Sequence, residues 1–226
     1  TGQLSADALR TLIDAPGMQR FAGEAAYTAR LTGVGQSEAN PTLSITSDLE
    51  GMALDFPAPL AKAAKDRWPL RAVWAYRGQT GRVLEVALRD SMRARLVRHS
   101  DAGARYFDSG SVAVGRDTTW DEPGMGLDIA HPVFDGDAWD RVVKEFTSDS
   151  GTDTEGEGVF PRVRSMRVQT EQGRLMGMPL THLTYTIRQT DATEWRADIA
   201  ATETAGTLTW TEENNVIQGP VQAVFH

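Results

Sequence analysis

The chain has 226 residues, of which 40% are hydrophobic and 24% are charged, as in an ordinary globular protein. Its formal net charge of −8 argues against nucleic acid as a partner, because phosphate binding requires a concentrated basic face. The absence of cysteine excludes disulfides, thiolate metal sites and thiol nucleophiles. No apolar run reaches the roughly 18 to 20 residues needed to cross a bilayer, and the sequence does not open with a signal peptide.

The first 60 residues predict one short helix followed by two strands. Ser5 is suited to cap a helix whose apolar residues recur at i, i+3 and i+4. Alternating apolar residues then predict a strand at 25–33 and a second, longer strand at 43–60. In the longer strand the apolar phase changes at Gly51, which predicts a β-bulge and a bend.

The middle of the chain predicts further strands and a longer helix. Alternation predicts strands at 70–76, 83–88, 92–96, 106–114 and 127–130, with a hairpin turn at 77–81. Asp137 is suited to cap a helix over 137–146, in which apolar residues follow the i, i+3, i+4, i+7 pattern. The acidic stretch 147–158 has no apolar side chain, which predicts a flexible loop.

The last third of the chain predicts an antiparallel meander. Its strands are expected at 163–169, 173–178, 183–188, 195–201, 207–211 and 216–225. Turn signals at Gln172-Gly173, Asp191-Ala192 and 213–215 separate some of these strands.

Together these elements predict a mainly β fold, a long and strongly curved antiparallel sheet that forms a groove, with about two short α-helices. We expect two parts: a curved β segment with its N-terminal helix at 1–131, then a helix, an acidic loop and a meander at 132–226. Two short helices cannot cover one apolar face of so many strands, and soluble monomers rarely leave such a face exposed. The sheet must therefore close into a sandwich or barrel, lie partly on the helices, or bind a ligand on its apolar face.

The usual sequence motifs of catalysis and metal binding are absent. The histidines are scattered without metal-ligand spacing: His99, His131, His182 and His226. There is no GxSxG elbow and no phosphate loop, and the acidic run 149–157 lacks the ligand order of a calcium loop. Carboxylates are plentiful, yet no pair stands out for glycoside hydrolysis. We therefore predict no enzymatic activity, no metal and no cofactor.

Four arginines gather at Arg89, Arg93, Arg95 and Arg98. One interpretation is the water-facing side of a hairpin. The other is contact with the phosphates of lipid headgroups, which guanidinium groups bind well. Under the second interpretation, the candidates are Arg93 and Arg95.

Several motifs resemble one family of bacterial envelope proteins. Residues 47–60, SDLEGMALDFPAPL, resemble the SDLxGLxxxLPxPL stretch of AsmA-like proteins, specifically the YhdP branch. Residues 2–9 are similar to the GxxSAxxL stretch that precedes it, and 134–139 to the family's LDLDAW, with departures at Phe134 and Gly136. The glycines and tryptophans of 163–219 resemble the strand series of its C-terminal part. The similarity covers nearly the whole chain in the right order.

The resemblance implies a very long protein that is anchored in the inner membrane by one N-terminal helix and crosses the periplasm. Its relatives include TamB and the bridge-like lipid transfer proteins, in which a curved sheet forms an apolar groove for phospholipid passing between the inner and outer membranes. The start at Thr1 and the strand-like end at 221–226 then suggest an internal segment, with the anchor elsewhere. The implied partners are phospholipid, flanking segments of the same chain and other envelope proteins.

In this hypothesis, acyl chains lie on the apolar side of the sheet and gain roughly 0.8 kcal/mol per buried methylene. The candidate groove residues are Leu54, Phe56, Trp74, Tyr76, Leu84, Val86, Leu88, Leu183, Tyr185, Ile187, Trp195 and Ile199. Alternation alone is equally typical of a core. Two alternatives stay open: a closed β-sandwich that acts as a spacer or protein-interaction module, and a carbohydrate-binding or hydrolytic domain with Trp74, Trp120 or Trp195 as a sugar platform.

Overall fold

The computed structural model describes residues 1–12, 17–33, 40–76, 81–98, 107–117, 122–148, 161–213 and 216–225. Its helices are α1 (Ala6–Leu12), the 3₁₀ turn η1 (Met18–Arg20) and α2 (Gly136–Ser148). The strands are β1 (Gly2–Ser5), β2 (Phe21–Thr32), β3 (Thr42–Ser47), β4 (Met52–Leu54), β5 (Leu70–Tyr76), β6 (Arg82–Leu88), β7 (Met92–Arg98), β8 (Ser109–Val114), β9 (Gly124–Ala130), β10 (Val133–Asp135), β11 (Val163–Leu175), β12 (Met178–Gln189), β13 (Glu194–Ala200), β14 (Ala205–Glu213) and β15 (Val216–Phe225).

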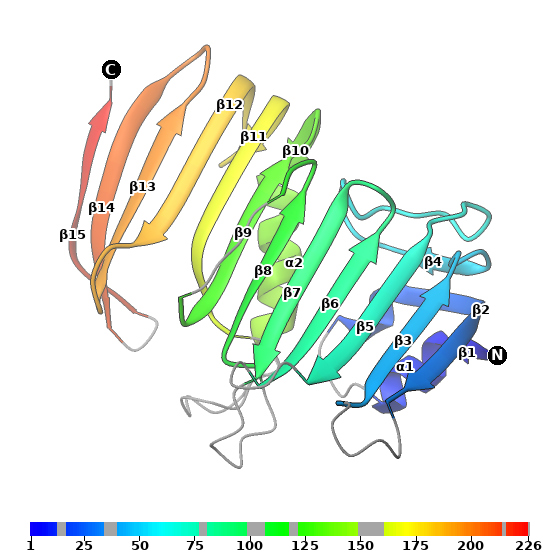
Figure 1. Ribbon diagram of the computed structural model, residues 1–226. Coiled ribbons are helices and arrows are strands. Elements are labelled where there is room, and N and C mark those ends of the chain that lie inside the picture. The colour runs from blue at the N-terminus through cyan, green and yellow to red at the C-terminus, as the bar shows by residue number, and fades with distance from the viewer. Residues whose placement is uncertain are drawn as a thin grey trace.

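The described strands form one open sheet (Figure 1), whose main path runs β1-β2-β3-β5-β6-β7-β8-β9-β11-β12-β13-β14-β15. Most of its ladders are antiparallel, so the predicted mainly β fold with two α-helices is confirmed. The ladders β8–β9, β9–β11 and β10–β11 are parallel instead. Parallel neighbours require a crossover, and β10 with α2 forms the crossover from β9 to β11. The ladder β9–β11 joins the two predicted parts of the chain. The division of the chain into these two parts stays a prediction.

The single bent strand predicted at 43–60 is wrong. The chain forms β3 and β4 instead, separated by a turn in which Leu49 and Gly51 have φ angles of 52° and 96°. A Cβ atom on Gly51 would lie 2.3 Å from the carbonyl oxygen of Glu24, so only glycine fits this close crossing. The strand β4 thereby leaves the main sheet and pairs with the beginning of β2.

Both predicted helices are present, but one cap is wrong. As predicted, Ser5 caps α1, and its hydroxyl accepts a hydrogen bond from the Ala8 N–H. Helix α2 is capped by Asp135, which accepts from the Ala138 N–H, and not by Asp137. The Asp137 carboxylate instead accepts from two backbone N–H groups in the turn between β11 and β12.

One predicted turn is also wrong. Gln172 and Gly173 lie inside β11, and the hairpin turn comes later, at Met176 and Gly177. The turn predicted at 77–81 and the acidic loop predicted at 147–158 lie for their larger part outside the described residues.

The pairing register sorts the side chains of the sheet into two faces, because cross-strand partners point to the same side. An unbroken apolar row crosses from β2 to β15: Ala29, Ile45, Ala72, Val86, Ala94, Val112, Leu127, Met166, Ile187, Ala197, Leu208 and Ala223. We call its side of the sheet the apolar face. The adjacent cross-strand row, from β2 to β14, lies on the opposite side of the sheet. It holds Thr28, Thr46, Arg71, Ala87, Arg93, Ala113, Asp128, Arg167, Thr186, Asp198 and Thr207. We call that side the polar face.

A second layer of chain lies on part of the apolar face. It comprises α1, η1, β4, the segment 55–69 and α2, and we call it the covering layer. Figure 1 shows α1 and α2 behind the sheet, on the same side. The buried cluster that joins this layer to the sheet contains Ala25, Leu49, Met52, Leu54, Trp68 and Leu88. The apolar face is therefore covered at one end of β5 to β7, and α2 packs against β11.

Candidate functional site on the apolar face

The predicted groove residues that belong to β5, β6, β12 and β13 all lie on the apolar face. They are Trp74, Tyr76, Leu84, Val86, Leu88, Leu183, Tyr185, Ile187, Trp195 and Ile199. The sheet register thus brings residues from both halves of the sequence onto one surface.

Burial divides this set into core residues and surface residues. Leu88 packs under the covering layer, and Leu183 is only 1% exposed. Tyr76 is 39% exposed, and the others are half-buried. Burial raises the pKa of the Tyr185 hydroxyl above its ordinary value. Half-buried side chains on an open sheet shield one another and together present an apolar surface.

The remaining two candidates, Leu54 and Phe56, belong to the covering layer. Leu54 is 8% exposed and lies in the buried cluster. The Phe56 ring stacks on Trp139 of α2, with centroids 6.2 Å apart, and meets Phe21 edge-on at 5.6 Å. Both side chains therefore pack inside the covering layer or against the sheet beneath it. Lipid contact by any of the twelve candidates stays a prediction.

An ion pair and hydrogen bonds connect α2 to the rest of the covering layer. The Arg20 guanidinium pairs with Glu145, with an Nη2–Oε2 distance of 2.7 Å, and also donates to the Asp55 carbonyl oxygen at 2.6 Å. Trp139 Nε1 donates to the Ala58 carbonyl oxygen at 2.8 Å. The layer is thus connected from η1 to α2.

Lys62 is a buried cation within this layer, with 4% of its surface exposed. Its ammonium group donates to the carbonyl oxygens of Leu49, Met52 and Ala63, at 2.8, 2.7 and 3.1 Å. These acceptors satisfy all the N–H donors of an ammonium group. Burial nevertheless lowers the pKa of Lys62 from its ordinary value, while three nearby carboxylates act in the opposite direction.

The predicted headgroup contacts, Arg93 and Arg95, lie on the polar face. Arg93 Nη1 donates to the carbonyl oxygens of Arg89 and Met92, at 3.2 and 3.0 Å, and so lies against the turn between β6 and β7. Both arginines point away from the apolar row, and their contact with headgroups stays a prediction.

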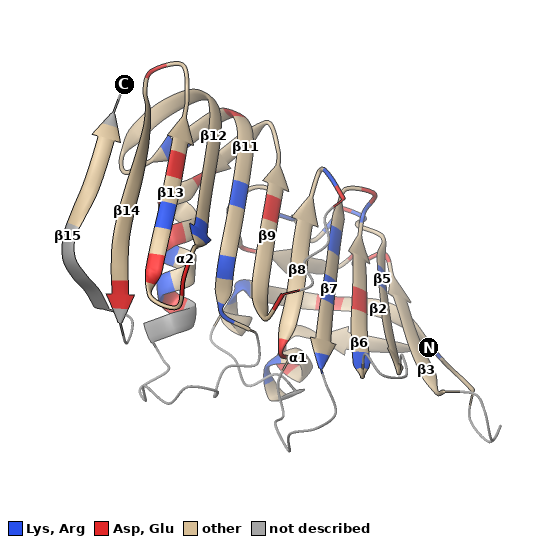
Figure 2. Cartoon of the chain, turned by 60° about the vertical axis from the view of Figure 1, so that its left-hand side comes forward, with Lys and Arg blue, Asp and Glu red and all other residues tan. Residues whose placement is uncertain are grey.

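The polar face carries charges that compensate one another. Figure 2 shows charged residues along β6, β7, β9, β11 and β13. Asp198 accepts from Arg196 and from the Thr207 hydroxyl, at 2.8 and 2.7 Å, and these hydrogen bonds lower the pKa of its carboxyl group. Arg116 Nε lies 3.3 Å from Asp128 Oδ1. These charged side chains favour water, although the same face also holds a buried apolar set of cross-strand neighbours, Ala75, Val83 and Val97.

Metal-binding geometry is not formed by the described residues, which contain no cluster of three or more His, Cys, Asp or Glu. The His131 ring bonds to the backbone of Val133, and the His182 ring lies 3.3 Å from the Thr202 hydroxyl. His99 and His226 lie outside the described residues. Within the described part of the chain, no helix has the length and apolar character to cross a bilayer.

Several members of the apolar row were not singled out from the sequence: Ala94, Val112, Leu127, Met166 and Leu208. Each of these residues follows the alternation of its own strand, and this alternation is the sequence signal that indicates its side of the sheet. The alignment of these residues across the sheet depends on the register, which alternation alone does not fix when connections cross over.

The family model described as YhdP protein matches residues 1–225, almost the whole chain. The chain belongs to the YhdP family. The resemblance carried by residues 47–60 and the later motifs is thereby confirmed, and this YhdP-family chain is associated with the bacterial cell envelope. Comparison with the curated proteins and with the solved structures gives no match.

Proposed function

We propose that this YhdP-family chain is a periplasmic segment of a lipid-bridge protein that is anchored in the inner membrane through another part of the protein. Its apolar face carries the acyl chains of phospholipids between the inner and outer membranes. Flanking segments of the same chain and other envelope proteins are its expected macromolecular partners. No covalent step is involved, so no side chain acts as a catalyst.

The unbroken apolar row from β2 to β15 carries this proposal. With strands about 4.8 Å apart, the row extends for about 50 Å across the sheet. Each methylene buried against it gains roughly 0.8 kcal/mol, while headgroups stay in water beyond the edge of the face. Because this gain does not depend on one geometry, an acyl chain meets similar surface along the whole row.

The two alternatives have less support. A closed β-sandwich requires a second sheet on the apolar face, whereas the described strands form one open sheet with a partial covering layer. A sugar platform requires free aromatic faces beside carboxylates. Trp195 instead stacks on Trp210, with centroids 6.2 Å apart, and Trp74 meets Phe107 edge-on. Trp120 lies outside the described residues.

A matched pair of substitutions on β6 tests the proposal. Val86→Asp places a carboxylate in the middle of the apolar row, between Ala72 and Ala94. Ala87→Asp places the same group on the polar face, between Arg71 and Arg93. Burying the unpaired carboxylate of Val86→Asp against acyl chains costs several kcal/mol. The carboxylate of Ala87→Asp lies between two arginines and stays in contact with water, so it costs little.

The measurement is the amount of phospholipid bound per chain after incubation with liposomes of phosphatidylethanolamine and phosphatidylglycerol, read by native mass spectrometry. We expect lipid on the wild type and on Ala87→Asp, and a more than roughly tenfold loss on Val86→Asp. Thermal melting shows that each variant is folded. Absence of lipid on the wild type, or equal loss in both variants, would contradict the proposal.

A further inference from the structure

A cavity of about 300 Å³ lies where the apolar face passes beneath the covering layer. Its floor is the end of the face, formed by Leu88, Met92 and Val114, which are cross-strand neighbours on β6, β7 and β8. Its walls include Leu60 and Trp68 of the covering layer. The volume is at the lower end of the range found for ligand pockets.

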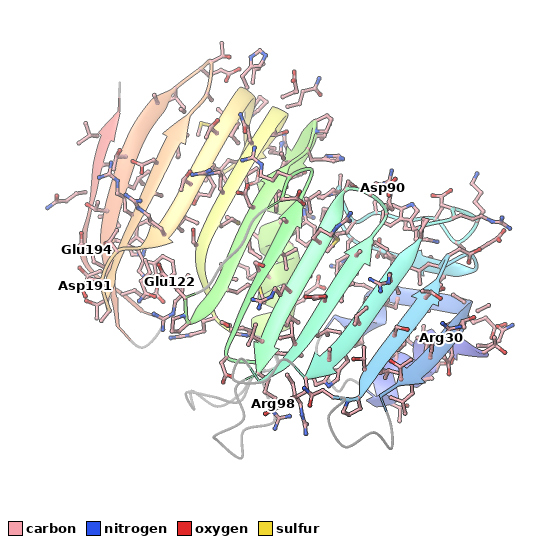
Figure 3. The ribbon with its side chains drawn as sticks, viewed as in Figure 1. Arg30, Asp90, Arg98, Glu122, Asp191 and Glu194 are labelled. Carbon is pink, nitrogen blue, oxygen red and sulfur yellow. The ribbon has the colours of Figure 1, made fainter. Side chains whose placement is uncertain are left out.

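The mouth of this cavity is polar and cationic. Arg89, Ser91 and His131 line it, and Arg89 and Ser91 are exposed. Asp90, labelled in Figure 3, marks the end of the sheet at which the cavity lies, and Arg98 marks the opposite end of β7. The cavity is therefore amphipathic, with a buried apolar floor and a wet rim.

Arg89 is held in place by its surroundings. Its φ angle of 54° is in the left-handed region, which residues with a side chain seldom adopt and which is enriched at binding sites. Its backbone N–H donates to the Pro69 carbonyl oxygen at 2.7 Å. Its guanidinium group lies over the Trp68 ring, 4.9 Å from the centroid. This contact favours a position of the cation at the mouth of the cavity in the absence of a ligand.

We propose that this cavity binds one glycerophospholipid at a defined position, with the end of an acyl chain on the Leu88–Val114 floor and the phosphate on Arg89. The inference rests on the proposed function and adds to it a site of headgroup recognition. A guanidinium group bonds phosphate oxygens with two parallel N–H donors. The cavity thus distinguishes a phosphate-bearing amphiphile from a neutral one, which the open apolar row does not.

Two amphiphiles with the same tail test this site: 1-palmitoyl lysophosphatidic acid and 1-monopalmitoylglycerol, which differ only in the phosphate. Their affinities for the purified chain are measured by native mass spectrometry. We expect the wild type to prefer the phosphate-bearing amphiphile by about tenfold, the effect of a charge-assisted hydrogen bond. Arg89→Gln removes the preference, Arg89→Lys retains most of it, and the affinity for monopalmitoylglycerol stays unchanged in both.

Arg82→Gln is the matched control, because Arg82 is an exposed arginine at the other end of β6. It leaves the preference intact. Leu60→Trp fills the cavity and lowers the affinity for lysophosphatidic acid without altering Arg89. Glycerol 3-phosphate, which carries the phosphate without the tail, is not bound detectably.

The outcomes separate this inference from the function on which it rests. An equal preference in the wild type and Arg89→Gln, or tight binding of glycerol 3-phosphate, overturns the proposed site while acyl-chain binding stands. If the wild type binds neither amphiphile and takes up no phospholipid from liposomes, the proposed function itself fails.

Discussion

Two regions of the apolar face share one sequence pattern and differ in what lies on them. Beneath the covering layer, Leu88 lies in a buried cluster with Trp68 and Leu54 of that layer. On β12 to β14, Ile187, Ile199 and Leu208 are half-buried, and these strands contact mainly their neighbours in the sheet. Alternation therefore reports which side of a strand is apolar. It does not report whether that side meets protein or a ligand.

The largest contrast is expected from removing a leucine in each region. Leu88→Ala removes a side chain of β6 from the buried cluster and lowers the free energy of unfolding by roughly 2–5 kcal/mol. Leu208→Ala on the open region lowers it by only about 1 kcal/mol, because the wild-type side chain is half-exposed already. Urea unfolding followed by circular dichroism measures both. Similar losses in the two variants would mean that β14 is covered as fully as β6.

A smaller effect is expected from Lys62→Met. The substitution keeps the apolar stem but removes the donor from three carbonyl oxygens, at a cost of roughly 2–4 kcal/mol at neutral pH. Burial lowers the pKa of Lys62 in the folded chain, so the unfolded chain binds more protons between that pKa and the ordinary 10.5. The wild type therefore gains stability relative to the variant as the pH rises through this window.

The measurement for Lys62 is the free energy of unfolding of wild type and variant at several alkaline pH values. A difference that stays constant up to pH values above the ordinary lysine pKa would show that Lys62 has the same pKa in both states. If Lys62→Met takes up less phospholipid from liposomes under conditions in which it stays folded, the covering layer takes part in lipid binding.

The smallest effect is expected at the link between the layer and α2. A double-mutant cycle with Arg20→Gln and Glu145→Gln should give a coupling energy of about 1 kcal/mol, since the pair is bidentate and partly shielded. The exposed pair Lys144–Asp140 on the same helix is the control, with roughly 0.3–0.5 kcal/mol. Equal coupling in both pairs would mean that Arg20 adds no more than a surface ion pair.

Much of this architecture could be predicted from the sequence, because the later part of β12 and β13 alternate between apolar and polar residues on either side of a turn signal. The turn at Leu49–Gly51 could not be predicted. The change in apolar phase at Gly51 fits a β-bulge as well as a reversal of the chain. Which of the two forms depends on the close crossing of Gly51 with Glu24, which is distant in sequence. The sequence does not decide the cap of α2, because Asp135 and Asp137 are both good caps. Only the neighbouring hairpin turn, which binds Asp137, decides between them.

The candidate site was predictable in kind but not in extent. Tyr185 is predictable because it is large and lies between two threonines, and Trp74 is predictable by its size and its place in the alternation with Tyr76. The small residues that keep the row continuous, such as Ala72 and Ala94, have no such signal. Leu54 and Leu183 are buried, so their substitution also changes stability, and their contact with lipid stays a prediction.

The contact between Arg20 and Glu145 also bears on how the chain folds, because it joins residues 125 positions apart. Closing so long a loop costs more chain entropy than any hairpin of the meander. Helix α2 can therefore dock on η1 at low cost only after β3 to β9 have paired and shortened the intervening chain. The hairpins are expected to form first and the contact between α2 and η1 last, so that α2 is also the first part of the covering layer to open when the protein unfolds.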